Sequence, residues 1–181
     1  VFMANKNLFT MNSDLGWEYL ETGNIGIQIS RSSHRIISGE PLGIFYGYKS
    51  VGLNQWGEWI IETGSGEEGT IFGIPYDARQ VIGNGLPGKF LGLNNSILYK
   101  DYDLHLTLRG AFGFQVLNLQ RMNYENPNQV TNLLSTAHDP VFGGDLTYFP
   151  EYVSYYVEDG DYLKIDNVTL GYTKHVKKIL S

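Results

Sequence analysis

The chain has 181 residues, of which 42% are hydrophobic, so it has the composition of a folded protein and not of a disordered one. Only 18% of the residues are charged, while 14% are aromatic and 22 are glycine, a profile typical of all-β proteins with aromatic anchoring. The net charge of −6 argues against a nucleic-acid partner, because phosphate binding requires a positive face, and the absence of Cys excludes disulfides and thiolate metal sites.

The N-terminal part of the chain predicts no complete element. Residues 1–40 contain apolar strand fragments, but Gly16, Gly23 and the polar run 30–35 interrupt them. No stretch of the chain approaches the roughly 20 consecutive apolar residues that a membrane-spanning helix needs. Strands of a transmembrane barrel escape this test, because their lipid-facing and lumen-facing residues alternate.

Two strands joined by a tight turn are predicted from residue 89 onward. Between Lys89 and Lys100, apolar residues mostly alternate with small or polar ones, and residues 100–103 form the turn. In the second strand five apolar residues share one face: Leu104, Leu106, Leu108, Phe112 and Phe114. Four polar residues fall on the other face: His105, Thr107, Arg109 and Gln115. The pattern indicates a hairpin whose faces meet different surroundings.

The connection after this hairpin is long. Residues 116–160 are rich in Asn, Pro, Tyr and Gly and predict at most one short helix, at 130–137. Such a connection argues against a compact soluble domain but is expected of the external loops of outer-membrane barrels. We therefore expect residues 116–160 to lie outside the cell, and residues 44–88 to lie there too or to line the barrel mouth.

A third strand is predicted at residues 162–173. Its two faces are less distinct, since Leu163 and Ile165 have one parity and Val168 and Leu170 have the other. Each of the three strands runs about 11 residues, which is enough to cross a bilayer at a tilt, whereas strands in globular proteins peak near 5–6 residues. A soluble sandwich with long strands remains the alternative.

The sequence contains no pattern that indicates catalysis or a cofactor. Residues 83–88 satisfy G-x-G-x-x-G, but Pro87 and a strand follow where a dinucleotide site requires a helix. The four His residues have no metal-ligand spacing, and the acidic clusters at 67–68 and 158–161 are better explained as solvated loops than as Ca²⁺ sites. We predict no enzyme activity, no catalytic residue, no cofactor and no metal.

Aromatic side chains in the connections are candidates for ligand contact, because their faces can stack on a solute; packing within the loops or at a membrane interface is the alternative for each. The candidates are Trp56, Trp59, Tyr124 and Tyr148.

Four segments resemble SusC/RagA-type TonB-dependent transporters. They are PLGIFYGYKSVG at 41–52, VIGNGLP at 81–87 leading to GLNN at 92–95, YKDYDL at 99–104 with LRGAFG at 108–113, and VEDGDYLKIDNVTLGY at 157–172. They occur in the family's order. The resemblance implies an all-β fold, here part of an antiparallel transmembrane β-barrel of about 22 strands. All of residues 1–181 would belong to the barrel domain, with the plug and the terminal strands outside this chain.

The resemblance also implies a function. The protein would sit in the bacterial outer membrane as a multi-pass barrel in contact with lipid, and it would import oligosaccharides or peptides under the control of TonB. A SusD-like surface lipoprotein would be its partner. In this arrangement the apolar face of residues 104–114 meets lipid and the polar face of residues 105–115 meets the lumen or the plug. The alternatives are a soluble or surface carbohydrate-binding β-sandwich and a passive porin.

Overall fold

A computed structural model describes the chain except for residues 13, 15, 27–28, 30, 129–131 and 175–181. The structure divides into two compact units. The first, here called the long-strand unit, comprises Val1–Asn5, Pro87–Gly113 and Asp161–Ser181. The second, here called the core unit, comprises Lys6–Leu86 and Phe114–Gly160. None of the helices among the described residues is both long and apolar enough to cross a membrane.

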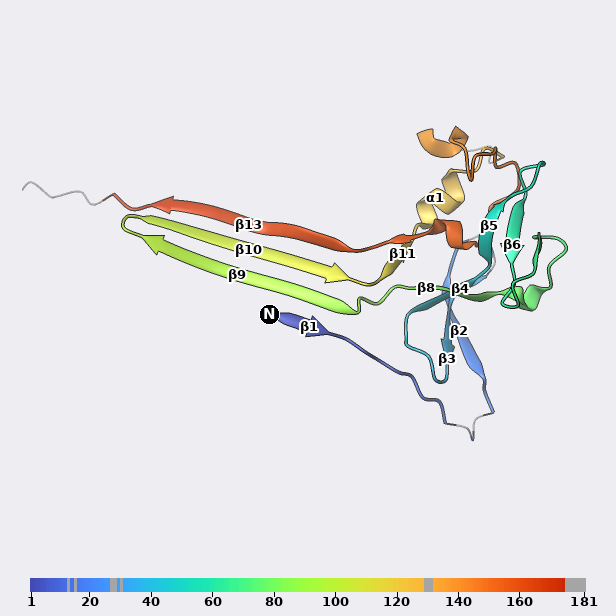
Figure 1. Cartoon of the computed structure of the whole chain (residues 1–181), viewed down its shortest axis with the longest axis horizontal. Coiled ribbons are helices and arrows are strands. Elements are labelled where there is room, and N and C mark those ends of the chain that lie inside the picture. Colours follow the sequence, from blue (N-terminus) through green and yellow to red (C-terminus); the bar gives the residue numbers. More distant parts are fainter. Residues whose placement is uncertain (13, 15, 27–28, 30, 129–131, 175–181) are drawn as a thin grey trace, which may run out of the picture. The chain divides into compact units, whose positions relative to one another are not determined.

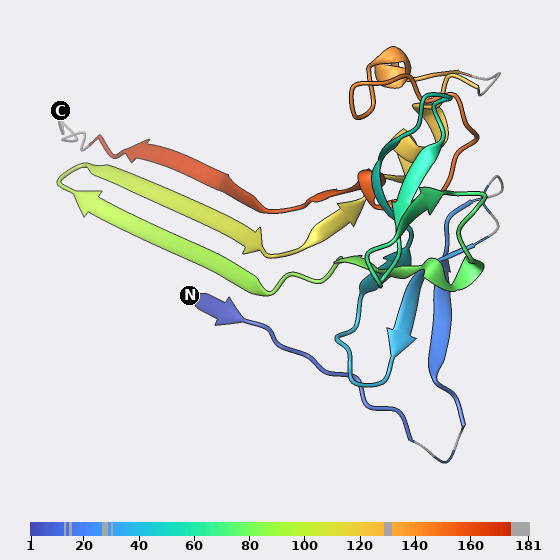
Figure 2. The same cartoon turned by 45° about the vertical axis from the view of Figure 1, so that its right-hand side comes forward.

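The long-strand unit is one antiparallel sheet in the order β1-β9-β10-β13 (Figures 1 and 2). Its strands are β1 (Phe2–Ala4), β9 (Lys89–Tyr99), β10 (Tyr102–Phe112) and β13 (Tyr162–Tyr172), and the last three have 11 residues each. The β9–β10 turn leaves only Lys100 and Asp101 between the paired residues Tyr99 and Tyr102. Lys100 has φ 56°, the left-handed conformation that two-residue hairpin turns favour. The predicted hairpin and the predicted third strand are therefore confirmed.

A β-bulge in β13 explains why its sequence alternates poorly. Thr107 of β10 pairs with Asn167, but the next residue, Leu108, pairs with Ile165, so Asp166 is left over. The extra residue reverses the parity of β13. Leu163 and Ile165 on one side of the bulge consequently share a face with Val168, Leu170 and Tyr172 on the other side, although their sequence positions differ in parity.

The core unit contains three small antiparallel sheets. The first has the order β2-β3-β4-β8, the second β5-β6-β7 and the third β11-β12. The strands are β2 (Tyr19–Asn24), β3 (Ser32–Ile37), β4 (Ile44–Gly47), β5 (Lys49–Leu53), β6 (Trp59–Glu62), β7 (Glu68–Thr70), β8 (Gln80–Asn84), β11 (Gln115–Leu117) and β12 (Val157–Asp159). The helical segments are η2 (Tyr76–Ala78), α1 (Leu119–Tyr124), η3 (Ser135–His138) and η4 (Ser154–Tyr156).

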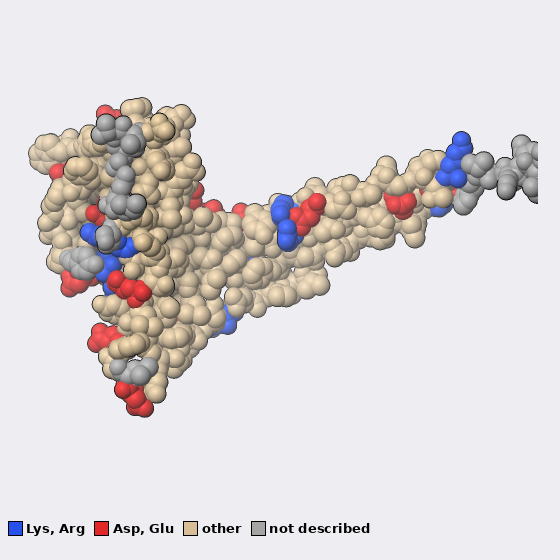
Figure 3. All heavy atoms as spheres, turned by 180° about the vertical axis from the view of Figure 1, so that it is seen from behind, with Lys and Arg blue, Asp and Glu red and all other residues tan. Residues whose placement is uncertain are grey.

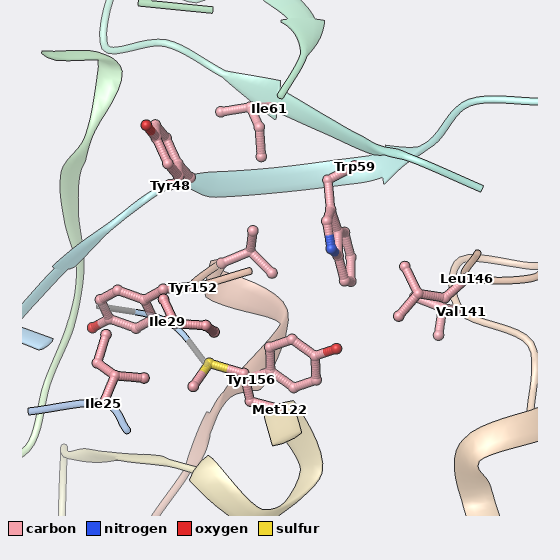
Figure 4. Packing of buried hydrophobic residues seen from close by; sticks show 11 residues of the cluster. Ile25, Ile29, Tyr48, Trp59, Ile61, Met122, Val141, Leu146, Tyr152 and Tyr156 are labelled. Carbon is pink, nitrogen blue, oxygen red and sulfur yellow. The ribbon is translucent and has the colours of Figure 1, made fainter. Parts of the chain in front are cut away.

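A hydrophobic cluster holds these segments of the core unit together. Trp59 and Ile61 of β6, Met122 of α1 and Tyr156 of η4 are all fully buried in it. Figure 4 shows them converging from separate elements, with Tyr48 and Tyr152 alongside. Trp59 packs against Tyr156 with ring centroids 5.9 Å apart and an interplanar angle of 75°, an edge-to-face arrangement that aromatic rings favour. Side chains from residues 25 to 156 therefore form a single core.

Two expectations about the chain after residue 109 need correction. β10 ends at Phe112, because Gly113 takes a left-handed φ of 73° and the chain enters the core unit, where β11 begins at Gln115. The α-helix of the long connection lies at Leu119–Tyr124, earlier than the predicted 130–137. Of that predicted helix, residues 130 and 131 lie outside the described residues, and only a short 3-10 turn at Ser135–His138 overlaps its end.

Candidate functional site

The leucine-rich side of β10 forms a largely apolar face across β9, β10 and β13, in which Asn95, opposite Leu106, is a polar exception. Residues directly opposite one another in an antiparallel pair point to the same side of a sheet. Leu104 is opposite Ile97 and Leu170, Leu106 is opposite Val168, and Leu108 is opposite Leu93 and Ile165. The apolar residues of three strands thus share a face, which we call the leucine face.

Much of the leucine face is exposed. Leu170 is 72% exposed, Ile165 63%, Val168 59% and Ile97 52%. Burying one such side chain contributes about 1.5–3 kcal/mol, so a row of them left in water is costly. Contiguous exposed apolar surface of this kind marks contact with another protein or with lipid.

The opposite side of the same sheet is polar along the middle of β10, although Leu98 and Phe90 of β9 also lie on it. His105, Thr107 and Arg109 point to this side and pair across β13 with Thr169, Asn167 and Lys164. Across β9, they pair with Ser96, Asn94 and Gly92. Figure 3 shows the charged side chains on the visible face of this unit gathered in a few spots with uncharged surface between them. We call this side the polar face.

An ion-pair cluster stands on the polar face at the bulge. The bulged Asp166 accepts from Arg109 Nε at 2.8 Å, and Lys164 Nζ lies 3.0 Å from its other carboxylate oxygen. A hollow of about 530 Å³ adjoins the cluster and is bordered by Met3, Phe90 and Tyr162 as well as by Arg109 and Asp166. Both cations are therefore compensated by the residue that the bulge adds.

The last two residues assigned to the predicted second strand, Phe114 and Gln115, do not belong to β10. Phe112 is the last residue of β10 and pairs with Lys89, on the side of the leucine face. Phe114 and Gln115 belong to the core unit, where the amide Oε1 of Gln115 accepts from the backbone N–H of Asn84 at 2.8 Å. The alternation of β10 therefore says nothing about which surroundings Phe114 and Gln115 meet.

The four candidate ligand-contact aromatics differ in exposure. Trp59 is fully buried in the hydrophobic cluster, so it offers no surface to a solute. Trp56 is 65% exposed, Tyr124 lies exposed at the end of α1, and Tyr148 is half-buried.

Tyr148 belongs to a cluster that the sequence did not predict. Its ring lies 4.7 Å from Phe72 and 5.6 Å from Phe149, measured between centroids, and both of these phenylalanines are exposed. The Trp56 carbonyl accepts from the Thr147 hydroxyl, which brings Trp56 to the same segment. We call Phe72, Tyr148 and Phe149 the aromatic surface. Aromatic residues in polar connections were the only signal in the sequence that could have found it.

A second unpredicted feature is the network around Arg121. The Asn118 side chain caps the start of α1 by accepting from the Arg121 backbone N–H at 2.9 Å. The Arg121 guanidinium then donates to Glu125 at 2.7 Å, to Glu158, and to the Tyr155 hydroxyl at 3.0 Å. The hydrogen bond that Arg121 donates to Glu125 raises the pKa of Arg121, and the hydrogen bond that it donates to Glu158 lowers the pKa of Glu158. Only the Arg121–Glu125 spacing of four residues hints at this network in the sequence.

A third charged cluster ties the first sheet of the core unit together. The Arg35 guanidinium lies 3.8 Å from the ring centroids of both Tyr19 and Tyr46. Glu21 pairs with Arg35 at 2.6 Å and with Arg79 at 3.1 Å, and the hydrogen bond from Arg35 is the main reason that the pKa of Glu21 is lowered. No three His, Asp or Glu residues among those described gather closely enough to hold a metal ion.

Comparison with known proteins gives consistent results. No family model matches the chain. TonB-dependent receptor P26 of Formosa agariphila is 29% identical over 167 residues, which are 80% of this chain and 17% of that protein. TonB-dependent receptor P3 of the same organism is 26% identical over 189 residues, or 94% of this chain and 19% of that protein. The chain thus spans less than a fifth of the length of these relatives.

Solved structures show the same fold. The RagAB peptide importer in its closed-closed state superposes with a TM-score of 0.67 at 17% identity, over 87% of this chain and 18% of that chain. A second structure of the RagAB peptide transporter gives 0.68 at 15% identity with the same coverage. The antiparallel sheets are accordingly a partial β-barrel fold. In sequence the chain therefore resembles TonB-dependent receptors, and in fold it resembles the RagAB structures, which supports its likeness to SusC/RagA-type TonB-dependent transporters.

Proposed function

We propose that the protein to which this chain belongs imports nutrients across the outer membrane in a TonB-dependent manner, and that this chain supplies part of its barrel wall and external loops. The leucine face carries the proposal, because its exposed side chains require an apolar medium while the polar face of the same sheet requires water. The resemblance to TonB-dependent receptors along most of the chain supports it.

Residue roles follow from this arrangement. Leu104, Leu106, Leu108 and Phe112 face lipid, whereas His105, Thr107 and Arg109 face the lumen or the plug. Their positions on opposite sides of one sheet support the assignment. Arg109 already forms an ion pair with Asp166, so a plug carboxylate that contacts Arg109 would share the Arg109 guanidinium with Asp166.

The partners we propose are a SusD-like surface lipoprotein and TonB, and the cargo is an oligosaccharide or a peptide. The structural likeness to the RagAB peptide importer supports a two-component importer. No bond is made or broken by this chain. Substrate captured outside shifts the lid and plug between two populated states, and it does so only by binding one state more tightly than the other.

Labelling of single cysteines in the complete receptor tests the proposal. The chain has no native Cys, so Leu106→Cys and Thr107→Cys compare neighbouring positions of one strand. In intact outer-membrane vesicles we expect a water-soluble maleimide to label Thr107→Cys and to spare Leu106→Cys. A lipid-dissolved quencher should reach a fluorophore at position 106 only.

Equal labelling by the water-soluble reagent at both positions would reject a lipid-covered leucine face. Release of the unmodified protein from membranes without detergent would favour a soluble sandwich instead. Uptake that persists after TonB is deleted would favour a passive porin.

A further inference from the structure

The leucine face ends in a row of three tyrosines. Tyr102 of β10 is opposite Tyr99 of β9 and Tyr172 of β13, so the three side chains point to the same side of the sheet as the leucines. All three are exposed, and the rings of Tyr102 and Tyr172 lie 4.9 Å apart between centroids. Figure 1 shows the end of β13 beside the β9–β10 turn, where these residues lie. We call them the tyrosine row.

The length of the strands places this row at one edge of the apolar band of the membrane. β9 has 11 residues, so at a rise of about 3.4 Å per residue it is about 34 Å long. Tilted by about 40°, as barrel strands are, it rises about 26 Å, which is close to the height of about 25 Å of an outer-membrane apolar band. On the proposed function, the tyrosine row therefore lies where hydrocarbon meets the polar lipid headgroups. Tyrosine suits this level, because its ring is apolar and its hydroxyl is polar.

Hydrogen-bond donors without partners gather at the tyrosine row. The Lys100 ammonium lies 5.3 Å from the centroid of the Tyr99 ring, a cation–π contact. Among the described residues this ammonium forms no ion pair, and none of the three tyrosine hydroxyls makes a hydrogen bond. The row therefore offers an ammonium and three hydroxyls to a ligand.

The turn beside the row carries a positive balance of charge. Lys174 follows the end of β13, and the Thr173 backbone N–H donates to the Asp101 carbonyl at 2.7 Å, which keeps Lys174 next to the turn. Asp101 is thus one acid against two lysines. Asp103 points to the polar face, where its carboxylate lies 3.6 Å from His105. This balance favours a ligand with negative charge and hydrogen-bond acceptors.

We propose that the tyrosine row and Lys100 bind the phosphate of an anionic phospholipid, whose acyl chains lie along the leucine face. A phosphate diester has a negative charge and accepts hydrogen bonds, so it suits an ammonium and hydroxyls that donate them. The inference rests on the proposed function, because acyl chains reach the row only if lipid covers the leucine face.

Native mass spectrometry of the complete receptor with added lipid tests this site. Phosphatidylglycerol and phosphatidylcholine with identical acyl chains are the probes, and we expect the anionic phosphatidylglycerol to bind more tightly. Lys100→Asn should weaken phosphatidylglycerol binding about fivefold, the usual contribution of one lysine near an anionic lipid surface. Asparagine preserves the turn, because it tolerates the left-handed φ of 56° at this position. Lys49→Gln removes an exposed cation of the core unit and is the control, expected to bind like the wild type.

A second variant removes the hydroxyls and keeps the rings. Combining Tyr99→Phe, Tyr102→Phe and Tyr172→Phe should also weaken phosphatidylglycerol binding. The fraction of heat-resistant barrel on gels should stay at the wild-type level, because the hydroxyls make no hydrogen bond within the described chain.

Three outcomes would overturn the lipid site. They are equal affinity for the two lipids, wild-type affinity for phosphatidylglycerol in both site variants, and an equal loss of affinity in Lys49→Gln. Displacement of the lipid by an equal concentration of inorganic phosphate would overturn it as well, since the site would then take a free ion. The maleimide labelling of Leu106→Cys decides separately whether lipid covers the leucine face. If that position is spared while both lipids bind equally, the lipid site fails and the proposed function stands.

Discussion

Arg121 connects three separate parts of the core unit through one side chain. It reaches Glu125 at the end of α1, Glu158 of β12 and Tyr155 of η4. The planar guanidinium has five donors in a fixed fork, a geometry that the single ammonium of lysine cannot reproduce. The Glu125 side chain is 9% exposed, so it depends on this cation for its compensation.

Replacing Arg121 should therefore destabilise the core unit. We expect Arg121→Ala to lower the local free energy of unfolding by about 1–3 kcal/mol, because it leaves a nearly buried carboxylate unpaired. Arg121→Lys should restore only part of this loss. Native-state hydrogen exchange of α1 measures the effect. Lys49→Ala breaks an exposed pair with Glu62 and is the control, expected to cost less than about 1 kcal/mol; equal losses in both variants would contradict the prediction.

Glu158 makes the same network sensitive to acid. Hydrogen bonding to Arg121 lowers the pKa of Glu158 below its ordinary value of 4.5. A carboxyl whose pKa is depressed by folding contributes stability that is complete above the unfolded pKa and is lost as the pH falls through the folded pKa. We therefore expect the exchange protection of α1 to fall when the pH drops below 4.5. Glu158→Gln should be less protected at neutral pH and should lose less on acidification, and parallel curves for both proteins would argue against this role.

Among the elements, β13 shows how one added residue changes a whole strand. The apolar residues of β13 have one parity before the bulge at Asp166 and the other parity after it. The bulge brings both sets onto the same side of the sheet, the leucine face. It also places a carboxylate between Arg109 and Lys164 on the polar face.

Deleting Asp166 should prevent correct assembly. Without the extra residue, and with the rest of β13 in its present register, Leu163 and Ile165 would turn to the polar face. Each side chain would then lose about 1.5–3 kcal/mol of burial free energy. Asp166→Gly keeps the bulge and loses only the ion pairs, so it should fold. The fraction of heat-resistant barrel on gels distinguishes the two variants. Normal assembly of the deletion variant would show that the bulge does not set the faces.

The long strands could be predicted because alternation is a local signal. The run after Lys89 and the leucines at 104, 106 and 108 identified β9, β10 and their turn. The faces of β13 could not be assigned, since a bulge becomes visible only when the partner strand is in register. The end of β10 was missed because Phe114 continues the apolar parity, while Gly113 redirects the chain.

The polar residues of β10 were identified by their parity, but the Arg121 network was not predicted. Its residues lie in irregular segments and come together only through the fold. Arg121 and Glu158 are 37 positions apart, and no spacing rule connects them.

At the scale of the whole molecule, we expect a change within one unit to leave the fold of the other unit intact. Within the long-strand unit, the Gly113 backbone N–H donates to the Asp161 carboxylate at 2.6 Å, so the ends of the segment Phe114–Gly160 are close together. We expect replacement of this segment by a short turn to leave a heat-resistant barrel in the outer membrane and to abolish import.

A Gly/Ser linker of the original length is the control for loop length. On the proposed function it should also leave the barrel intact and remove import, because it lacks Met122, Tyr152 and Tyr156 of the hydrophobic cluster. Loss of heat-resistant barrel in both variants would show that the long-strand unit depends on the core unit for folding.

The leucine face has a further consequence for how the protein is made. A bacterial outer-membrane protein crosses an aqueous compartment before it inserts. In that aqueous compartment, the exposed leucine face and the unpaired edges of the strands would adhere to one another and to other chains. On the proposed function, the nascent strands must therefore be kept apart until they reach hydrocarbon, and aggregation should follow where they are not.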